Sequence, residues 1–199
     1  MGIVPLARAV PALVLGLVIT FSSDHSAGFG LIAFGIFALV TGAVLVAAAI
    51  RQLFVASART LFLIQGVVTL LAGVAAVVLP SGGTPYLIWV VSAWAILAGA
   101  LELVNGIRLR RIASGARDWI LTGALTLLLA CAVLIVPPGL AQEFTGPDEV
   151  TRVLTAAIMV VGLIGAWAVI VGVQLGIAAI PPRAGNAADP DAEQTQVVS

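Results

Sequence analysis

The chain has 199 residues, of which 61% are hydrophobic and only 9% are charged, and its formal net charge is zero. A soluble domain carries about 25% charged residues, so this chain has too few to cover a water-facing surface. Balanced charge also argues against nucleic acid as a partner, because phosphate groups require a basic surface. The composition therefore indicates an integral membrane protein whose main partner is the lipid bilayer.

Six apolar segments that are long enough to cross a bilayer follow one another along the chain. A transmembrane helix needs about 20 mostly apolar residues. The stretch 60–101 has no charge and is long enough for two crossings, and its middle, residues 80–85 (PSGGTP), has the composition of a tight turn. We therefore predict an all-α integral membrane protein with six transmembrane helices, at 4–22, 28–50, 60–79, 86–107, 119–137 and 153–179.

Several polar or bulky side chains lie toward the ends of these spans. Arg8 interrupts the first span, and we expect its long side chain to extend to the membrane interface. Pro11 lies in the first turns of that span, where a missing backbone amide costs least. Trp89, Trp94 and Trp119 are expected to anchor their helices at the two interfaces, as tryptophan commonly does.

Arginine residues are unevenly distributed between the two sides of the predicted bundle. Cytoplasmic connections of membrane proteins carry an excess of basic residues. One side holds only Arg152. The other side comprises the N-terminus, the second and fourth connections and the C-terminal tail. It holds the remaining arginines, namely Arg8, Arg51, Arg59, Arg108, Arg110, Arg111, Arg117 and Arg183. This pattern predicts that both termini are cytoplasmic. The tail, residues 181–199, is polar and acidic, and we expect it to be disordered.

Residues 1–180 are interpreted as one transmembrane domain built from three copies of a helical hairpin, at about 4–50, 59–107 and 117–179. Gly66, Gly73 and Pro80 on one rising helix match Gly123, Ala130 and Pro137 on the next at a constant offset. Each falling helix carries a Gly-Ala pair followed seven residues later by another small residue. Small residues let helices approach closely in lipid, so we interpret the following as packing positions: Gly42, Gly66, Gly73, Gly99, Gly106, Gly123, Gly165 and Gly172.

The third hairpin carries extra residues in its outer connection, within 139–151. In this segment, residues 145–149 (TGPDE) have proline and two acids where the first turn of a helix would lie. We therefore expect a helix to start there.

Three hairpins with Gly-x6-Gly-x6-Pro on the rising helix and Gly-Ala on the falling helix resemble the HdeD-like family. These are small bacterial inner-membrane proteins built from a short repeated domain of unknown function, and the resemblance covers residues 8–180. It implies a multi-pass protein of the bacterial inner membrane with a role in stress, because the named member of the family is associated with acid resistance. The resemblance carries over no catalytic or ligand-binding residue.

Glu102 is the strongest candidate for a functional residue, since an ionisable side chain within a membrane span is a functional hypothesis by default. Gln65 and Thr122 are expected at a similar depth, and Asn105 follows on the same helix face. One interpretation is structural, with Glu102 bonded to Gln65 and Asn105 or reaching the interface. The other is a site that responds to protons or cations. Arg108 lies near the opposite helix face and is not expected to pair with Glu102.

His25 and Asp24 form a second candidate site on the outer side. Histidine is the side chain whose charge changes near neutral pH, so this pair could sense external acid. The alternative is a pair of ordinary solvated loop residues.

Enzymatic chemistry has no support in the sequence. The single histidine has no nucleophile motif beside it, and the single cysteine, Cys131, excludes an intramolecular disulfide and a cysteine-based metal site. We expect no catalytic residue, cofactor or metal. Two functions stay open: a stress-associated membrane protein, as a homo-oligomer or an accessory subunit of a membrane complex, or a small proton or solute transporter or channel with Glu102 in its pathway.

Overall fold

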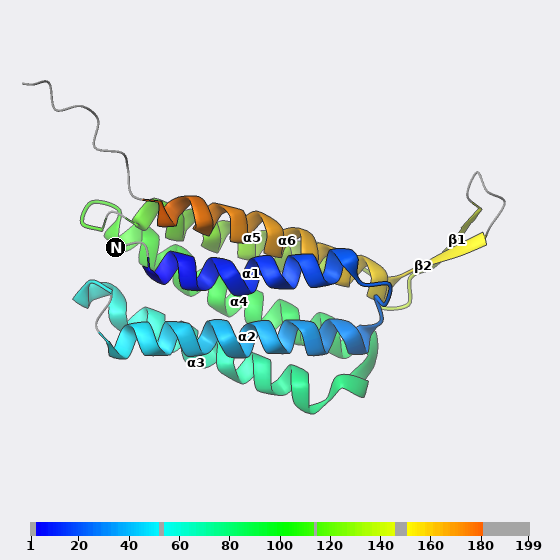
Figure 1. Ribbon diagram of the computed structural model, residues 1–199. Coiled ribbons are helices and arrows are strands. Elements are labelled where there is room, and N and C mark those ends of the chain that lie inside the picture. The colour runs from blue at the N-terminus through cyan, green and yellow to red at the C-terminus, as the bar shows by residue number, and fades with distance from the viewer. Residues whose placement is uncertain (1–2, 52–53, 114, 146–150, 181–199) are drawn as a thin grey trace, which may run out of the picture.

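The computed structural model describes residues 3–51, 54–113, 115–145 and 151–180, and it shows six long helices packed side by side (Figure 1). All six are long and apolar enough to cross a membrane. This confirms the six predicted helices, while the predicted disorder of 181–199 lies outside the described residues. The helices are α1 (Ile3–Phe21), α2 (Ala27–Ile50), α3 (Ala56–Val78), α4 (Gly83–Leu109), α5 (Ala116–Ile135) and α6 (Ala156–Ala179).

The turn between α3 and α4 follows the chemistry of residues 80–85. Pro80–Gly82 form a short 3-10 helix, and Gly83 has a φ of 74°, which glycine adopts without strain because it has no Cβ. The Tyr86 hydroxyl donates a hydrogen bond of 2.8 Å to the carbonyl oxygen of Ala75 on α3. The two helices are thus joined tightly at this end.

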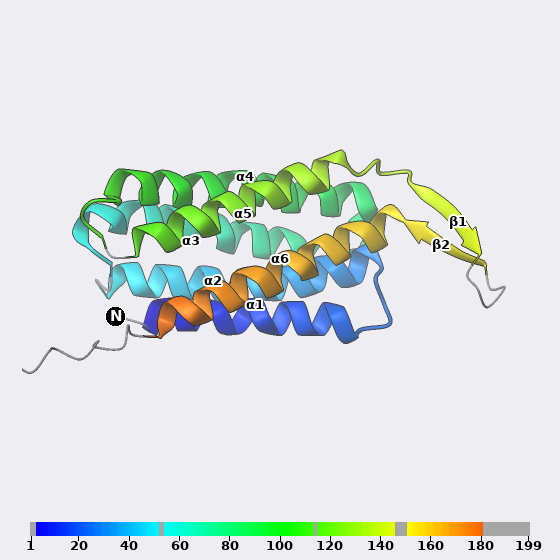
Figure 2. The ribbon, with the colours of Figure 1, turned by 90° about the horizontal axis from the view of Figure 1, so that it is seen from above.

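A two-stranded hairpin was not anticipated from the sequence. Strands β1 (Ala141–Thr145) and β2 (Thr151–Thr155) pair antiparallel, with Ala141 opposite Thr155, and extend away from the bundle (Figure 2). The expected helix start at 145–149 was wrong at Thr145, which belongs to β1, and residues 146–150 lie outside the described part of the chain. Residues 151–155 (TRVLT) are rich in β-branched side chains, which favour a strand, so α6 begins only at Ala156.

Glycines determine which helices pack most closely. A Cβ added at Gly42 on α2 would lie 2.9 Å from the carbonyl oxygen of Gly66 on α3. On α5, the same addition at Gly123 would lie 2.8 Å from the carbonyl oxygen of Gly99 on α4, and on α6 a Cβ at Gly172 would lie 3.0 Å from the Leu13 amide nitrogen of α1. The close pairs are therefore α2 with α3, α4 with α5, and α6 with α1, so the last helix closes onto the first. At seven of the eight glycines predicted as packing positions, an added Cβ would meet backbone atoms of a neighbouring helix, and at Gly165 it would meet the side chain of Ile19.

The two ends of the bundle differ in charge. The start of α1, the α2–α3 connection and the α4–α5 connection lie together at one end, and the β hairpin projects from the other (Figure 1). We call the first end the arginine-rich end, because it carries Arg51, Arg59, Arg108, Arg110, Arg111 and Arg117.

Candidate functional site

A buried ion pair joins α1 to α4 inside the bundle. Arg8 Nη1 donates to Glu102 Oε1 at 2.7 Å, and Arg8 Nη2 donates to Glu102 Oε2 at 2.8 Å. The two side chains are 8% and 2% exposed. A guanidinium and a carboxylate that share two parallel hydrogen bonds make the strongest pairing available to these groups, so the geometry fixes both side chains.

A third helix contributes to the same pair. Gln65 Nε2 on α3 donates a hydrogen bond of 2.9 Å to Glu102 Oε2. The carboxylate therefore accepts three hydrogen bonds from two other helices, and its charge is neutralised by the guanidinium. An ion without such partners would be very unfavourable in a medium of low dielectric constant, whereas here each charge has a counterion in direct contact.

The expected exposure of Arg8 at the membrane interface was wrong. Arg8 points into the bundle because Glu102, 94 positions away in sequence, offers a partner of opposite charge at a matching depth. Helix periodicity cannot reveal such a pairing. One sequence signal could have suggested it, since Arg8 and Glu102 are charges of opposite sign that each interrupt an apolar span near the same side of the membrane.

The other predicted residues lie near this pair but bond elsewhere. Asn105 Nδ2 donates to the carbonyl oxygen of Ala58 on α3 at 3.2 Å. Thr122 Oγ1 on α5 accepts a hydrogen bond of 3.2 Å from Gln174 Nε2 on α6, and Gln174 was not anticipated. Each bond crosses between helices, so Asn105 and Thr122 act as polar links between them.

A small cavity at the centre of the bundle brings most of these groups together. It has a volume of about 20 Å³ and is lined by residues from all six helices, including Arg8, Gln65, Glu102 and Thr122. Four further polar side chains in its wall were not predicted from the sequence, namely those of Thr41, Thr69, Thr126 and Trp167. Thr and Trp in apolar helices give a weak sequence signal, because most of them serve packing.

Aromatic rings enclose part of this cavity. Trp94 and Trp167 meet edge to face with their ring centroids 5.3 Å apart, and Phe37 meets both, at 6.1 and 5.7 Å. Trp94 is buried, so its expected position at the interface was wrong: its Nε1 donates to Thr69 Oγ1 at 3.2 Å inside the bundle. Edge-to-face rings pack densely and leave no room for a solute.

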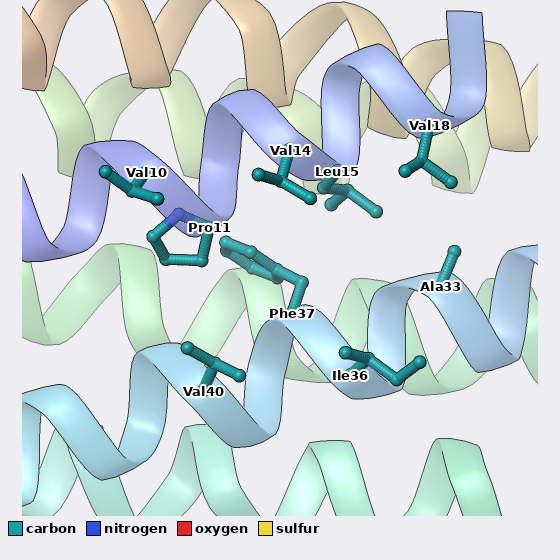
Figure 3. Close-up of a pocket in the computed structure, with 9 residues that line it drawn as sticks. All are labelled: Val10, Pro11, Val14, Leu15, Val18, Ala33, Ile36, Phe37 and Val40. Carbon is teal, nitrogen blue, oxygen red and sulfur yellow. The ribbon is translucent and has the colours of Figure 1, made fainter. Parts of the chain in front are cut away.

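An apolar groove runs along the outside of the bundle between α1 and α2. It has a volume of about 300 Å³, and Figure 3 shows Val10, Pro11 and Val14 of α1 facing Phe37 and Val40 of α2. Its walls offer hydrocarbon and almost no hydrogen-bonding group. The groove therefore suits lipid tails, and we do not assign it to a polar ligand.

Metal binding finds no support in the described parts of the chain. Within them, no group of three or more His, Cys, Asp and Glu side chains is placed to hold a metal ion.

The outer candidate site lies in the short connection between α1 and α2. Asp24 Oδ1 accepts a hydrogen bond of 2.8 Å from the amide of Ser26, and Ser26 Oγ caps α2 by accepting from the Phe29 amide at 3.2 Å. These bonds hold the pKa of the Asp24 carboxyl below its ordinary value of 3.8, first through the Ser26 amide, then the Ser26 side chain, with a small contribution from His25. Asp24 therefore helps to form the start of α2.

The pH dependence of this turn follows from the sign of the shift. A carboxyl whose pKa is lowered by folding stabilises the folded form above its unfolded pKa, and this contribution is lost as the pH falls through the lower, folded value. We expect the Ser26 amide to keep its protection from hydrogen exchange down to about pH 4 and to lose it only in stronger acid. NMR exchange measurements across a pH series would show this, and Asp24→Asn should remove the pH dependence. A pH dependence that persists in Asp24→Asn would show that Asp24 is not the group responsible.

The six apolar helices, with a charged pair enclosed among them, define a multi-pass integral membrane protein. A family model described as a short repeat of unknown function (DUF308) matches residues 64–135, from within α3 to the end of α5. No curated protein matches the chain, and no solved structure does.

Proposed function

We propose that this chain is a non-enzymatic, HdeD-like protein of the bacterial inner membrane that serves in the response to acid stress, as a homo-oligomer or an accessory subunit of a membrane complex. The observation that carries this proposal is the closed interior. The only charges found deep within the described helices are bonded to each other, and the central cavity of about 20 Å³ is too small for a solute. A transporter usually presents a larger polar site or broken helices at mid-membrane.

The proposal includes an architecture of three repeated hairpins with both termini in the cytoplasm. It is supported by the matched glycine contacts between α2 and α3, α4 and α5, and α6 and α1. The match to a short repeat also supports it, because HdeD-like proteins carry that repeat. The placement of the arginine-rich end in the cytoplasm is supported by the excess of basic residues that cytoplasmic connections carry.

Two measurements test this function together. Proton and ion flux into proteoliposomes that hold the purified protein should not exceed flux into empty liposomes at any external pH. A bacterial strain that lacks the gene should survive an acid shift less well than its parent, and the intact gene should restore survival. If survival is unaffected by the deletion, the stress role is wrong.

A second candidate function is a small proton or solute transporter or channel with Glu102 in its pathway. The observation that favours it is a pocket of about 170 Å³ at the arginine-rich end, lined by Arg8, Asp118 and Trp119 among others. Arg8 and Leu175 line both this pocket and the central cavity, so these two side chains lie between the pocket and the interior. An access route to Glu102 would therefore start at this end.

Flux measurements distinguish the two functions if the variants fold. Glu102→Gln alone leaves a buried arginine without its ionic partner, so the double variant Arg8→Met/Glu102→Gln serves as the folded, charge-free comparison. A pH-dependent flux in the natural protein that disappears in the double variant would establish the transporter. Acid survival and flux that both stay unchanged in the double variant would exclude any proton-responsive role of Glu102.

A further inference from the structure

Unpaired polar atoms gather around the central cavity. Eight buried side-chain nitrogen or oxygen atoms have no hydrogen-bond partner among the described residues, and four of them belong to residues that line this cavity. They are Arg8 Nε, Thr41 Oγ1, Gln65 Oε1 and Trp167 Nε1. Each of these side chains is more than nine-tenths buried. An unpaired buried polar group destabilises the folded state, so a cluster of them at one place points to a bound ligand.

The size of the cavity and the chemistry of its wall define that ligand. A cavity of about 20 Å³ exceeds the roughly 10–15 Å³ that one water molecule requires, and it holds nothing larger. The Trp167 indole only donates, the Gln65 carbonyl oxygen only accepts, and the Thr41 hydroxyl can do either. We propose that this cavity binds one ordered water molecule, which accepts from Trp167, donates to Gln65 and bonds with Thr41.

A bound cation fits the same wall poorly. The Arg8 guanidinium already neutralises the Glu102 carboxylate, and the Trp167 indole presents a hydrogen atom, which repels a positive ion. A water molecule uses donors and acceptors equally, so it matches a wall that offers both.

The water would join helices that the ion pair does not reach. Arg8, Glu102 and Gln65 link α1, α4 and α3, whereas Thr41 lies on α2 and Trp167 on α6. Through Gln65, which touches both the pair and the cavity, the water connects five helices into one hydrogen-bonded network. The role is independent of whether the protein transports anything.

Hydroxyl-radical footprinting tests the proposal with the full chain in nanodiscs. Radicals formed by X-rays from a bound water label the side chains beside it even where bulk solvent does not enter. We expect oxidation of Phe37 and Trp94, which line the cavity, above that of Phe34, which is also buried but is not in its wall. Thr41→Val should remove this labelling, because it deletes one hydrogen-bonding group and leaves the size of the side chain nearly unchanged.

Thr126→Val provides the matched control. Thr126 lines the same cavity, but its hydroxyl already donates to the carbonyl oxygen of Thr122 at 2.8 Å, so labelling should persist. Labelling of Phe37 and Trp94 no higher than that of Phe34 in the natural protein would overturn the proposal. So would labelling that survives Thr41→Val. A thermal midpoint that rises with Na⁺ or K⁺ over N-methylglucamine, and only when Thr41 is present, would assign the site to a cation instead.

Discussion

Glu102→Gln is expected to lower the free energy of unfolding by about 3–5 kcal/mol, because it leaves the Arg8 guanidinium charged inside the bundle without its ionic partner. Both side chains are almost fully enclosed, so solvent cannot compensate for the lost charge. Unfolding of the purified protein in mixed micelles by increasing SDS, followed by tryptophan fluorescence, measures this loss. Arg8→Met removes the other member of the pair and should have an effect of similar size, since it leaves the Glu102 carboxylate without its ionic partner.

The double variant Arg8→Met/Glu102→Gln tests whether the losses of stability in the single variants come from an unpaired buried charge. With both charges removed, no uncompensated ion remains, and a glutamine at position 102 can still accept the hydrogen bond from Gln65. The double variant should therefore be much more stable than either single variant, because replacing a whole buried pair is often neutral. Glu143→Gln, at an exposed position of β1, is the surface control and should change stability by no more than about 0.5 kcal/mol. Additive losses in the double variant would show that the two residues do not act as a pair.

Hydropathy and turn chemistry predicted the helices because both are local properties of the chain. An apolar segment long enough to span a bilayer is read directly from the residues, and Pro80 to Pro85 mark the break between two such segments. The β hairpin escaped prediction for the same reason. Its strands are stabilised by pairing with each other, and a short run such as 151–155 gives no helical or transmembrane signal of its own.

The sequence predicted only part of the candidate site. Glu102 and Gln65 were expected at one depth, and the structure brings them to 2.9 Å of each other. The identity of the ionic partner depends on which helices are neighbours, and that arrangement follows from glycine contacts spread over the whole chain. Arg8 and Trp94 were therefore assigned to the interface, although both are buried. The polar group of Arg8 bonds to a helix 94 positions away in sequence, and that of Trp94 bonds to the preceding helix, α3; no local pattern predicts either bond.

Glycine contacts also set the packing distance on which the ion pair depends, so Gly123→Ala is expected to destabilise the protein by about 1–3 kcal/mol, the usual effect of overpacking. The added Cβ would lie 2.6 Å from the Leu103 amide nitrogen and 2.8 Å from the Gly99 carbonyl oxygen. Both atoms belong to the backbone of α4 and cannot rotate away, so α4 and α5 must separate. SDS-induced unfolding measures the loss.

Two other glycines of the same bundle give the matched control. Gly162 and Gly176 lie on α6, and a Cβ added at either would meet nothing within 4 Å. Alanine there adds no collision and has the higher helix propensity, by about 1 kcal/mol, so Gly162→Ala and Gly176→Ala should be neutral or stabilising. All three substitutions replace glycine by alanine within a helix. A loss of stability at Gly123 only would therefore assign its effect to the contact between α4 and α5. If all three substitutions destabilise equally, backbone flexibility is the property that these glycines supply, and close packing does not hold α4 against α5.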